Sequence, residues 1–261
     1  MRADTARRGR LLLGPGHLGN PNDLSLRVVA ALRSAALVVV EEGSDHALEI
    51  TLRALSLPAP TTAALPSSGA LAPEVAARVF ATLDHGGDVL LFGVEEGIPG
   101  YADPGATLVL AVRRQRPEVA IQSLGGSSVI GAALLASGLS VDRVTVLGVT
   151  TAPEPQHERK LREVERWVGR LAGTGHAVGV LAPGADVLHL ARRLAGVGWI
   201  DARMVVCASL TLPGERVIDG SPETVLAAGL EADAPTVVWV LAELRGWHPR
   251  AWVAFAGRAF G

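Results

Sequence analysis

Short apolar runs alternate with stretches of helical periodicity along most of the chain. This alternation is typical of a mainly parallel β-sheet whose strands are joined by helices. The apolar runs predict strands over residues 11–14, 36–41, 88–93, 119–124, 144–147, 177–181, 204–209 and 236–242. The helical periods predict helices over residues 24–34, 73–84, 106–113, 127–137, 157–171, 186–194 and 222–227. The pattern therefore predicts the α/β fold class.

Two further segments and one break complete the predicted organisation. Residues 57–68 are rich in Pro, Thr and Ser and are predicted to form a connection. Residues 212–214 and 216–218 are compatible with the two arms of a hairpin. Glycine and serine residues at the edges of segment 125–148 mark a domain boundary. We therefore predict an N-terminal α/β domain over residues 1–124 and a C-terminal α/β domain over residues 125–261.

Composition narrows the class of protein. Of the 261 residues, 49% are apolar and 19% are charged, so the chain has ample material for a buried core. The formal charge of −2 does not indicate a nucleic-acid-binding domain, although a local arginine face would suffice for RNA. The one cysteine, Cys207, excludes an intramolecular disulfide framework and a multi-cysteine metal site. In an apolar strand it is more typical of a buried small residue than of a nucleophile.

The apolar stretches also bear on location. The basic N-terminus leads to only three leucines before Gly14, which is too short an apolar stretch for an export signal. No apolar run approaches the roughly 18 residues of a membrane-spanning helix. We expect a cytoplasmic protein with no membrane partner.

A glycine-rich turn follows the first predicted strand. The sequence Leu13-Gly14-Pro15-Gly16 lies where the strand ends, and glycine there lets the backbone approach a ligand that a side chain would block. In an open parallel sheet, ligands bind at the carboxyl ends of the strands. The turn lacks both the dinucleotide fingerprint GxGxxG and the phosphate-binding GxxxxGK. It is equally compatible with a generic strand-to-helix turn.

The segment 93–105 is the most informative loop. Its thirteen residues include four glycines, two prolines and three carboxylates, which excludes a helix or a strand. Loops of this length without regular structure tend to be functional. A carboxylate here could bind a ribose hydroxyl or an ammonium group, or face solvent.

Taken in order, these segments resemble the tetrapyrrole methylases, a family of S-adenosylmethionine (SAM)-dependent methyltransferases. The turn 13–16 and the segment 22–27 are similar to the family's first turn and helix start, and segment 36–41 to its second strand. The loop 95–105 has the length of the corresponding loop in the branch that methylates ribosomal RNA (rRNA) on the ribose 2′-hydroxyl. Segments 124–128, 205–220 and 234–238 resemble later motifs, so the similarity extends over nearly the whole chain.

The resemblance implies two αβα domains with mostly parallel or mixed sheets, a homodimer, and SAM bound in a cleft between the domains. It implies no metal, because the methyl group of SAM is already activated. Position by position, it implies cofactor contacts from Pro15, Gly93, Val94, Glu95, Ile98, Ser127, Ser128, Leu181, Ala182, Ala208, Pro235 and Thr236.

Departures from the family pattern bear on the acceptor. Glu95 stands where the family usually has Asp, and segment 41–44 lacks the arginine that the rRNA branch carries there. Most residues that face RNA in that branch are also missing. The leading hypothesis is a methyltransferase for a small molecule, a tetrapyrrole or another biosynthetic intermediate. The alternatives are rRNA 2′-O-methylation, which the loop favours, and a catalytically silent SAM-binding or scaffold protein.

Four side chains are candidates for catalytic proton transfer: Glu41, Glu42, Tyr101 and Asp103. The two glutamates end an apolar strand, where carboxylates are rarely placed without a reason. Asp103 is also compatible with a turn residue that fixes the loop. Tyr101, the only tyrosine, would either cover the substrate or pack the loop.

Overall fold

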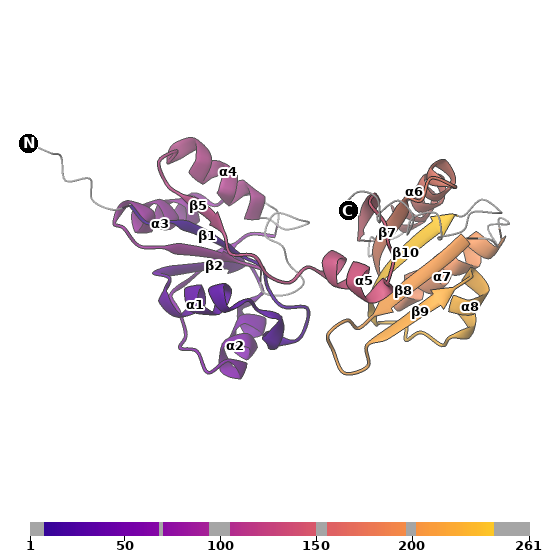
Figure 1. Ribbon diagram of the computed structural model, residues 1–261. Coiled ribbons are helices and arrows are strands. Elements are labelled where there is room, and N and C mark those ends of the chain that lie inside the picture. Colours follow the sequence, from indigo (N-terminus) through magenta and orange to yellow (C-terminus); the bar gives the residue numbers. More distant parts are fainter. Residues whose placement is uncertain (1–7, 68–69, 94–104, 150–155, 197–201, 243–261) are drawn as a thin grey trace, which may run out of the picture. The chain divides into compact units, whose positions relative to one another are not determined.

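The computed structural model describes residues 8–67, 70–93, 105–149, 156–196 and 202–242 (Figure 1). The chain divides into two compact units, Met1–Ala132 and Ala133–Gly261. The sequence places the boundary between Leu124 and Gly125, whereas the division in the structure falls inside helix α5 (Val129–Ser137). Each unit contains its own five-stranded sheet.

The first unit is built on a fully parallel sheet with the strand order β3-β2-β4-β1-β5. Its strands are β1 (Leu11–Gly14), β2 (Leu37–Glu41), β3 (Thr62–Leu65), β4 (Val89–Phe92) and β5 (Ile121–Ser123). The side chains of β4 and of Leu37 to Val40 in β2 are all buried. Continuous apolar runs form these strands because a parallel sheet is covered on both faces.

Helices cover the two faces of this sheet (Figure 1). Helices α1 (Leu26–Ser34) and α2 (Asp45–Ala54) pack on one face, and α3 (Pro73–Asp84) and α4 (Gly105–Gln115) on the other. The hydroxyl of Ser25 accepts a hydrogen bond from the Val28 amide and so caps α1, which follows a short 3₁₀ helix over Pro21–Asp23. Leu12, Leu90 and Val28 are buried between α1 and the strands.

The second unit has a mixed sheet with the order β6-β7-β10-β8-β9. Its strands are β6 (Val144–Val149), β7 (Ala177–Pro183), β8 (Ala202–Ala208), β9 (Arg216–Gly220) and β10 (Pro235–Ala242). Only β6 and β7 pair in parallel, and β10 runs antiparallel to both of its neighbours. The two sheets confirm the predicted α/β class with parallel or mixed strands.

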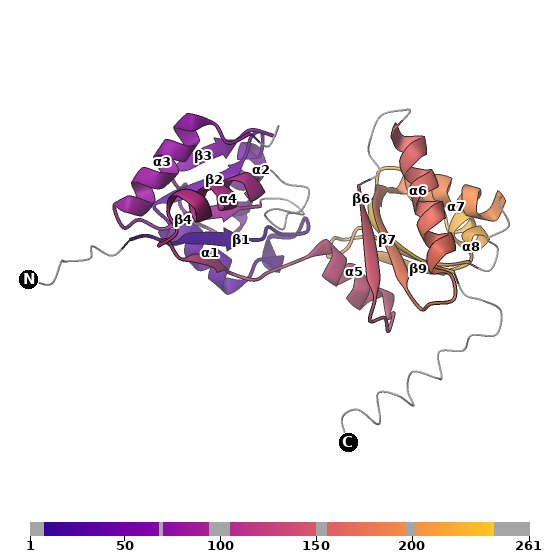
Figure 2. The ribbon, with the colours of Figure 1, turned by 90° about the horizontal axis from the view of Figure 1, so that it is seen from above.

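One face of the mixed sheet packs against α6 (Gln156–Leu171), α7 (Gly184–Gly196) and α8 (Pro222–Ala227). Helix α5 lies on the opposite face, where the Cys207 thiol donates to the Ala133 carbonyl at 3.5 Å (Figure 2). Within the described residues, no helix combines the length and the apolar character needed to cross a membrane.

Two local predictions were wrong. The connection 57–68 contains strand β3, which escapes the sequence pattern because it is short and half alanine. The hairpin arms are also different, since β9 pairs with β8 and residues 212–214 form part of the turn between them. Helix α2 was not predicted as an element.

Candidate functional site

The carboxyl ends of three strands meet at one edge of the first sheet. The Gly93 amide donates to the Gly14 carbonyl at 3.1 Å, and the Leu124 amide donates to the Leu13 carbonyl at 2.9 Å. Pro15, which follows Gly14, is buried at this edge. The ends of β4, β1 and β5 are therefore held side by side where open α/β sheets bind ligands.

The turn after β5 is fastened to the turn after β1. The Ser127 hydroxyl lies 2.9 Å from both the Gly16 and the Asp23 carbonyl oxygens, either of which can accept its one proton. A Cβ atom at Gly126 would lie 3.3 Å from the Pro15 ring, so glycine lets the two turns pack closely. Ser128, the next residue, accepts from the Gly131 amide in the first turn of α5.

The structure thus brings together Pro15, Gly93, Ser127 and Ser128, four of the residues predicted to bind the cofactor. The Ser127 hydroxyl is occupied by backbone carbonyls, so its contribution at this edge is to fix the shape of the turns.

His17 is a residue of this edge that sequence reasoning missed. It is only 5% exposed, and its Nδ1 accepts the Gly19 amide hydrogen at 3.0 Å. Its Nε2 therefore carries the proton and donates to the Thr51 hydroxyl at 2.8 Å, which in turn donates to the Ala47 carbonyl. Thr51 lies on α2, far along the sequence, so no local pattern could reveal the pair.

The two candidate glutamates lie at the end of β2. The register that pairs Val39 with Leu91 puts Glu41 at the level of Gly93. Glu41 is half-buried and Glu42 is exposed, and neither carboxylate forms an ion pair within the part of the chain that the structure describes.

The remaining predicted residues of the first unit fall in segment 94–104. Val94, Glu95, Ile98, Tyr101 and Asp103 all lie outside the described residues.

In the second unit, three predicted residues form one row across three strands. Thr236 of β10 pairs with Ala182 of β7 on one side and with Ala208 of β8 on the other. The three are buried, and the Thr236 hydroxyl donates to the Ala234 carbonyl at 2.9 Å. β7 and β8 end at this edge and β10 begins there, so the three buried residues lie together at one end of the second sheet.

The other two predicted residues adjoin this row. Pro235 is exposed at the start of β10, and half-buried Leu181 pairs with Val237. Ala182 and Ala208 add little side-chain bulk beside the backbone at this edge.

Cys207 lies beside the row as a structural thiol. Its side chain is buried, and burial, together with the negative charge of Glu215, raises the pKa of the thiol to about 11. A thiol with a raised pKa is protonated at neutral pH and is a poor nucleophile. The interpretation of Cys207 as a buried small residue is confirmed.

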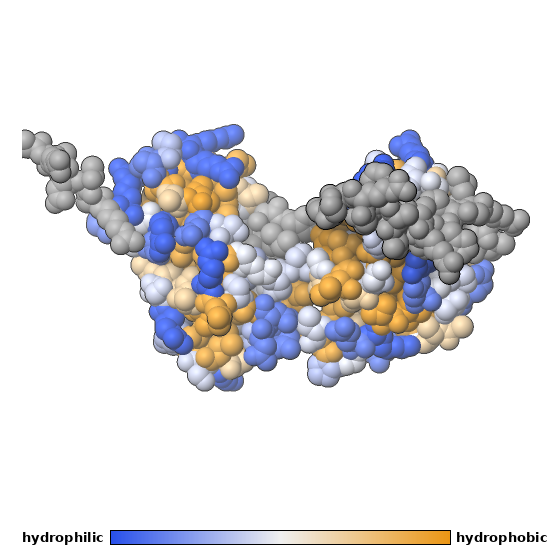
Figure 3. Space-filling model, viewed as in Figure 1, coloured by the Kyte–Doolittle hydropathy of each residue, from blue (hydrophilic) through white to orange (hydrophobic). Residues whose placement is uncertain are grey.

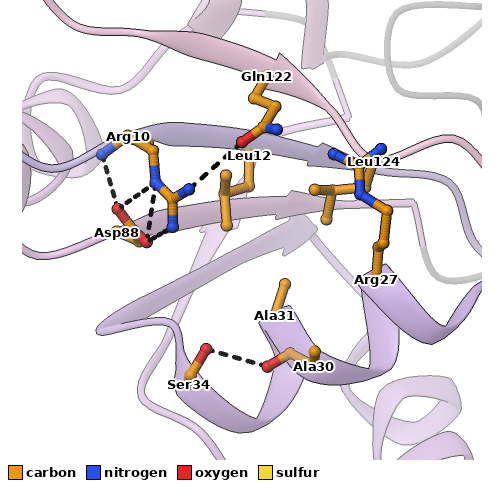
Figure 4. Close-up of a pocket in the computed structure, with 9 residues that line it drawn as sticks. All are labelled: Arg10, Leu12, Arg27, Ala30, Ala31, Ser34, Asp88, Gln122 and Leu124. Carbon is orange, nitrogen blue, oxygen red and sulfur yellow. Dashed lines mark hydrogen bonds and ion pairs between the residues drawn. The ribbon is translucent and has the colours of Figure 1, made fainter.

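A cavity of about 230 Å³ lies between α1 and strands β1 and β5 (Figure 4). Arg10 enters it at one end, where its Nη2 lies 2.5 Å from Asp88 Oδ2 and its Nη1 donates to Gln122 Oε1. Arg27 enters it from α1 at the other end. Because Asp88 compensates Arg10, the residues that line the cavity carry one net positive charge.

Comparison with known proteins identifies the family of this chain. A family model described as tetrapyrrole (corrin/porphyrin) methylases matches residues 13–225, a span that includes the turn after β1 and strands β7 and β8. The chain belongs to the tetrapyrrole methylases. The family predicted from the sequence is thereby confirmed.

Solved structures with the same fold include other methylases. A uroporphyrin-III C-methyltransferase from Thermus thermophilus has a TM-score of 0.53 at 20% identity, over 90% of this chain and 94% of that one. The methyltransferase CobJ has a TM-score of 0.55 at 20% identity, and covers 90% and 94%. A diphthine synthase has a TM-score of 0.63 at 17% identity, and covers 90% of each chain.

Relatives in sequence bear another name. The "ribosomal RNA small subunit methyltransferase I" of Mycobacterium tuberculosis H37Rv is 32% identical over 173 residues, 63% of this chain. Its namesake in Leptospira biflexa is 28% identical over 159 residues, 61% of this chain and 62% of that protein. The tetrapyrrole methylase described here spans 53% of the length of the M. tuberculosis relative.

Proposed function

We propose that this protein is a SAM-dependent methyltransferase. The observation that carries the proposal is the row Ala182–Thr236–Ala208 at the edge of the second sheet, together with the fastened turns at Pro15 and Ser127 in the first. Each unit therefore supplies part of the residue set that family resemblance assigns to the cofactor. A Thermus thermophilus methyltransferase of this fold was crystallised with S-adenosylhomocysteine, with a TM-score of 0.51 at 20% identity.

The residues present fit such a cofactor. SAM carries an activated methyl group on a sulfonium, so the protein has only to bind and align it. Residues with small side chains occur at both edges, and the Ser127 hydroxyl ties the two turns of the first edge together. Positioning of reactants in this way supplies roughly 7–11 kcal/mol of barrier lowering in well-oriented systems. We propose Glu41, at the carboxyl end of β2, as the group that takes the proton an acceptor loses.

We propose a small-molecule acceptor, a tetrapyrrole or another biosynthetic intermediate. The support is electrostatic, since eight arginines of the described residues form ion pairs with carboxylates. The paired arginines are Arg8, Arg10, Arg53, Arg116, Arg143, Arg162, Arg193 and Arg203.

Ribosomal RNA is the second candidate acceptor. The observation in its favour is the 32% identity to the mycobacterial rRNA methyltransferase. An RNA substrate would require positively charged side chains beside the site, and the ion pairs of the described residues neutralise part of that charge.

The acceptor is tested by methyl transfer from SAM labelled in its methyl group. Purified protein is incubated with tetrapyrrole carboxylic acids and, separately, with small-subunit rRNA and small ribosomal subunits. Label in a tetrapyrrole supports the first proposal, and label only in RNA replaces it with the second. SAM binding without transfer to either class favours a catalytically silent SAM-binding or scaffold protein.

We further propose that the protein is cytoplasmic and works as a homodimer. Helix α5 supports the dimer, because it is apolar on all sides yet leaves Leu135 86% exposed. Figure 3 shows apolar surface on the second unit where this helix lies. A helix that is apolar all round is normally buried, and a second copy of the chain would cover it.

A further inference from the structure

The turn after β8 has an unusual backbone. Ser209 has a φ of 51° and Thr211 a φ of 66°, and the described residues include only one other non-glycine residue with positive φ, Ser56. Left-handed backbone is uncommon for any residue with a side chain and is an outlier for a β-branched residue such as Thr. Such conformations persist only where the surroundings impose them, and they cluster at binding and catalytic sites.

Hydrogen bonds hold this turn in place, and four of them lie between described residues. The Ser209 amide donates to the Pro235 carbonyl at 2.9 Å, and two further backbone bonds close the turn, from Leu212 to Ser209 at 3.1 Å and from Glu215 to Leu212 at 3.0 Å. In the fourth bond the acceptor is a side chain, because the Thr211 amide donates to Glu215 Oε2 at 2.8 Å. A carboxylate that accepts from a backbone amide forms a stronger bond than a neutral acceptor.

The turn directly follows the row Ala182–Thr236–Ala208 at the edge of the second sheet. Ala208 pairs with Thr236, and the next residue, Ser209, continues the contact with β10 through Pro235. A shift of the turn would therefore also shift the backbone of Ala208 and Pro235.

We propose that Glu215 is a positioning residue for SAM binding, which holds Thr211 in the left-handed conformation and so fixes the backbone after Ala208. The inference rests on the proposed function, because it assigns a role toward the same cofactor. Glu215 itself is exposed at the turn and acts through the Thr211 amide.

Substitution of Glu215 distinguishes a role in positioning the SAM site from a role in stabilising the fold. We expect Glu215→Ala to weaken SAM binding about tenfold, a factor that corresponds to ~1.4 kcal/mol, with little change in melting temperature. Glu215→Gln keeps an acceptor oxygen and is expected to bind SAM within about threefold of the unchanged protein. Glu223→Ala, which removes an exposed carboxylate of α8, is the matched control and should bind normally.

A rescue variant makes the test specific to the backbone. Glycine adopts positive φ without strain, so Thr211→Gly no longer needs the carboxylate. We expect Thr211→Gly added to Glu215→Ala to restore most of the lost affinity for SAM, measured by titration calorimetry on the full chain. Equal affinity of Glu215→Ala and the unchanged protein, or no rescue by Thr211→Gly, would overturn the inference. Failure of the unchanged protein to bind SAM would instead overturn the proposed function.

Discussion

Gly179 and Trp239 lie directly opposite each other on β7 and β10. A Cβ atom at residue 179 would lie 2.4 Å from the Trp239 ring, which is far inside van der Waals contact. The ring is fully buried, so it has no free space into which it can move. Glycine at 179 therefore allows the largest fully buried side chain of the second unit to sit across the sheet, on the face where α5 packs.

We expect Gly179→Ala to lower the free energy of unfolding by about 1–3 kcal/mol, the usual penalty for overpacking. The measurement is urea unfolding of the two proteins side by side. Gly196→Ala is the matched control, because nothing lies within 4 Å of its new methyl group at the end of α7. Equal urea midpoints for Gly179→Ala and Gly196→Ala would show that the Trp239 indole is not held as the structure describes.

The ability to predict single site residues from the sequence depends on whether they lie in a recognisable segment. Pro15 and Ser127 belong to glycine-rich segments, which mark close backbone approaches in any sequence, and in the structure the two turns pack together. His17 and Glu215 carry no such mark. The role of His17 depends on Thr51, and that of Glu215 on a left-handed Thr211, and both depend on geometry that periodicity does not encode.

At the scale of the elements, the edge strand β9 is joined to β8 by the Arg203–Asp219 ion pair as well as by backbone hydrogen bonds. Arg203 Nη2 lies 2.6 Å from Asp219 Oδ2, and the hydrogen bond from Arg203 lowers the pKa of Asp219 below its usual value of 3.8. A carboxylate with a lowered pKa stabilises the fold above its unfolded pKa. The contribution disappears as the pH falls through the lower pKa of the folded state.

We expect Asp219→Asn to lower the free energy of unfolding by ~0.2–1 kcal/mol at neutral pH, a small value because both side chains are partly exposed. The difference from the unchanged protein should vanish at pH values well below 3.8. Urea unfolding at neutral and acid pH measures both quantities. A difference that stays constant across this range would contradict the assignment.

Long apolar strands and amphipathic helices could be predicted well, because burial on two faces or on one stripe leaves a clear period in the sequence. Helices α3 and α8 and strand β1 match their predicted bounds. Strand β3 could not be predicted in this way, since Thr62–Leu65 is held by pairing with β2 rather than by its own propensity. The predicted hairpin was wrong for the same reason, because β9 pairs with β8, which the sequence predicts as a separate strand.

At the scale of the whole molecule, the exposed side chain of Leu135 on α5 allows the proposed dimer to be tested. We expect the unchanged protein to have about twice the monomer mass of 27.0 kDa in light scattering, and Leu135→Asp to have the monomer mass. Leu110→Asp is the control, because Leu110 is 47% exposed on a different helix, α4. A monomeric unchanged protein, or a dimer that survives Leu135→Asp, would show that α5 is not the interface.

We infer that this tetrapyrrole methylase binds SAM with residues from both of its units. The measurement that tests this inference is titration calorimetry of the full chain with SAM and with S-adenosylhomocysteine. We expect micromolar or tighter binding of both compounds, weakened by Ser127→Trp in the first unit and by Pro235→Glu in the second. A folded protein that binds neither compound, or binding that both substitutions leave unchanged, would contradict the account.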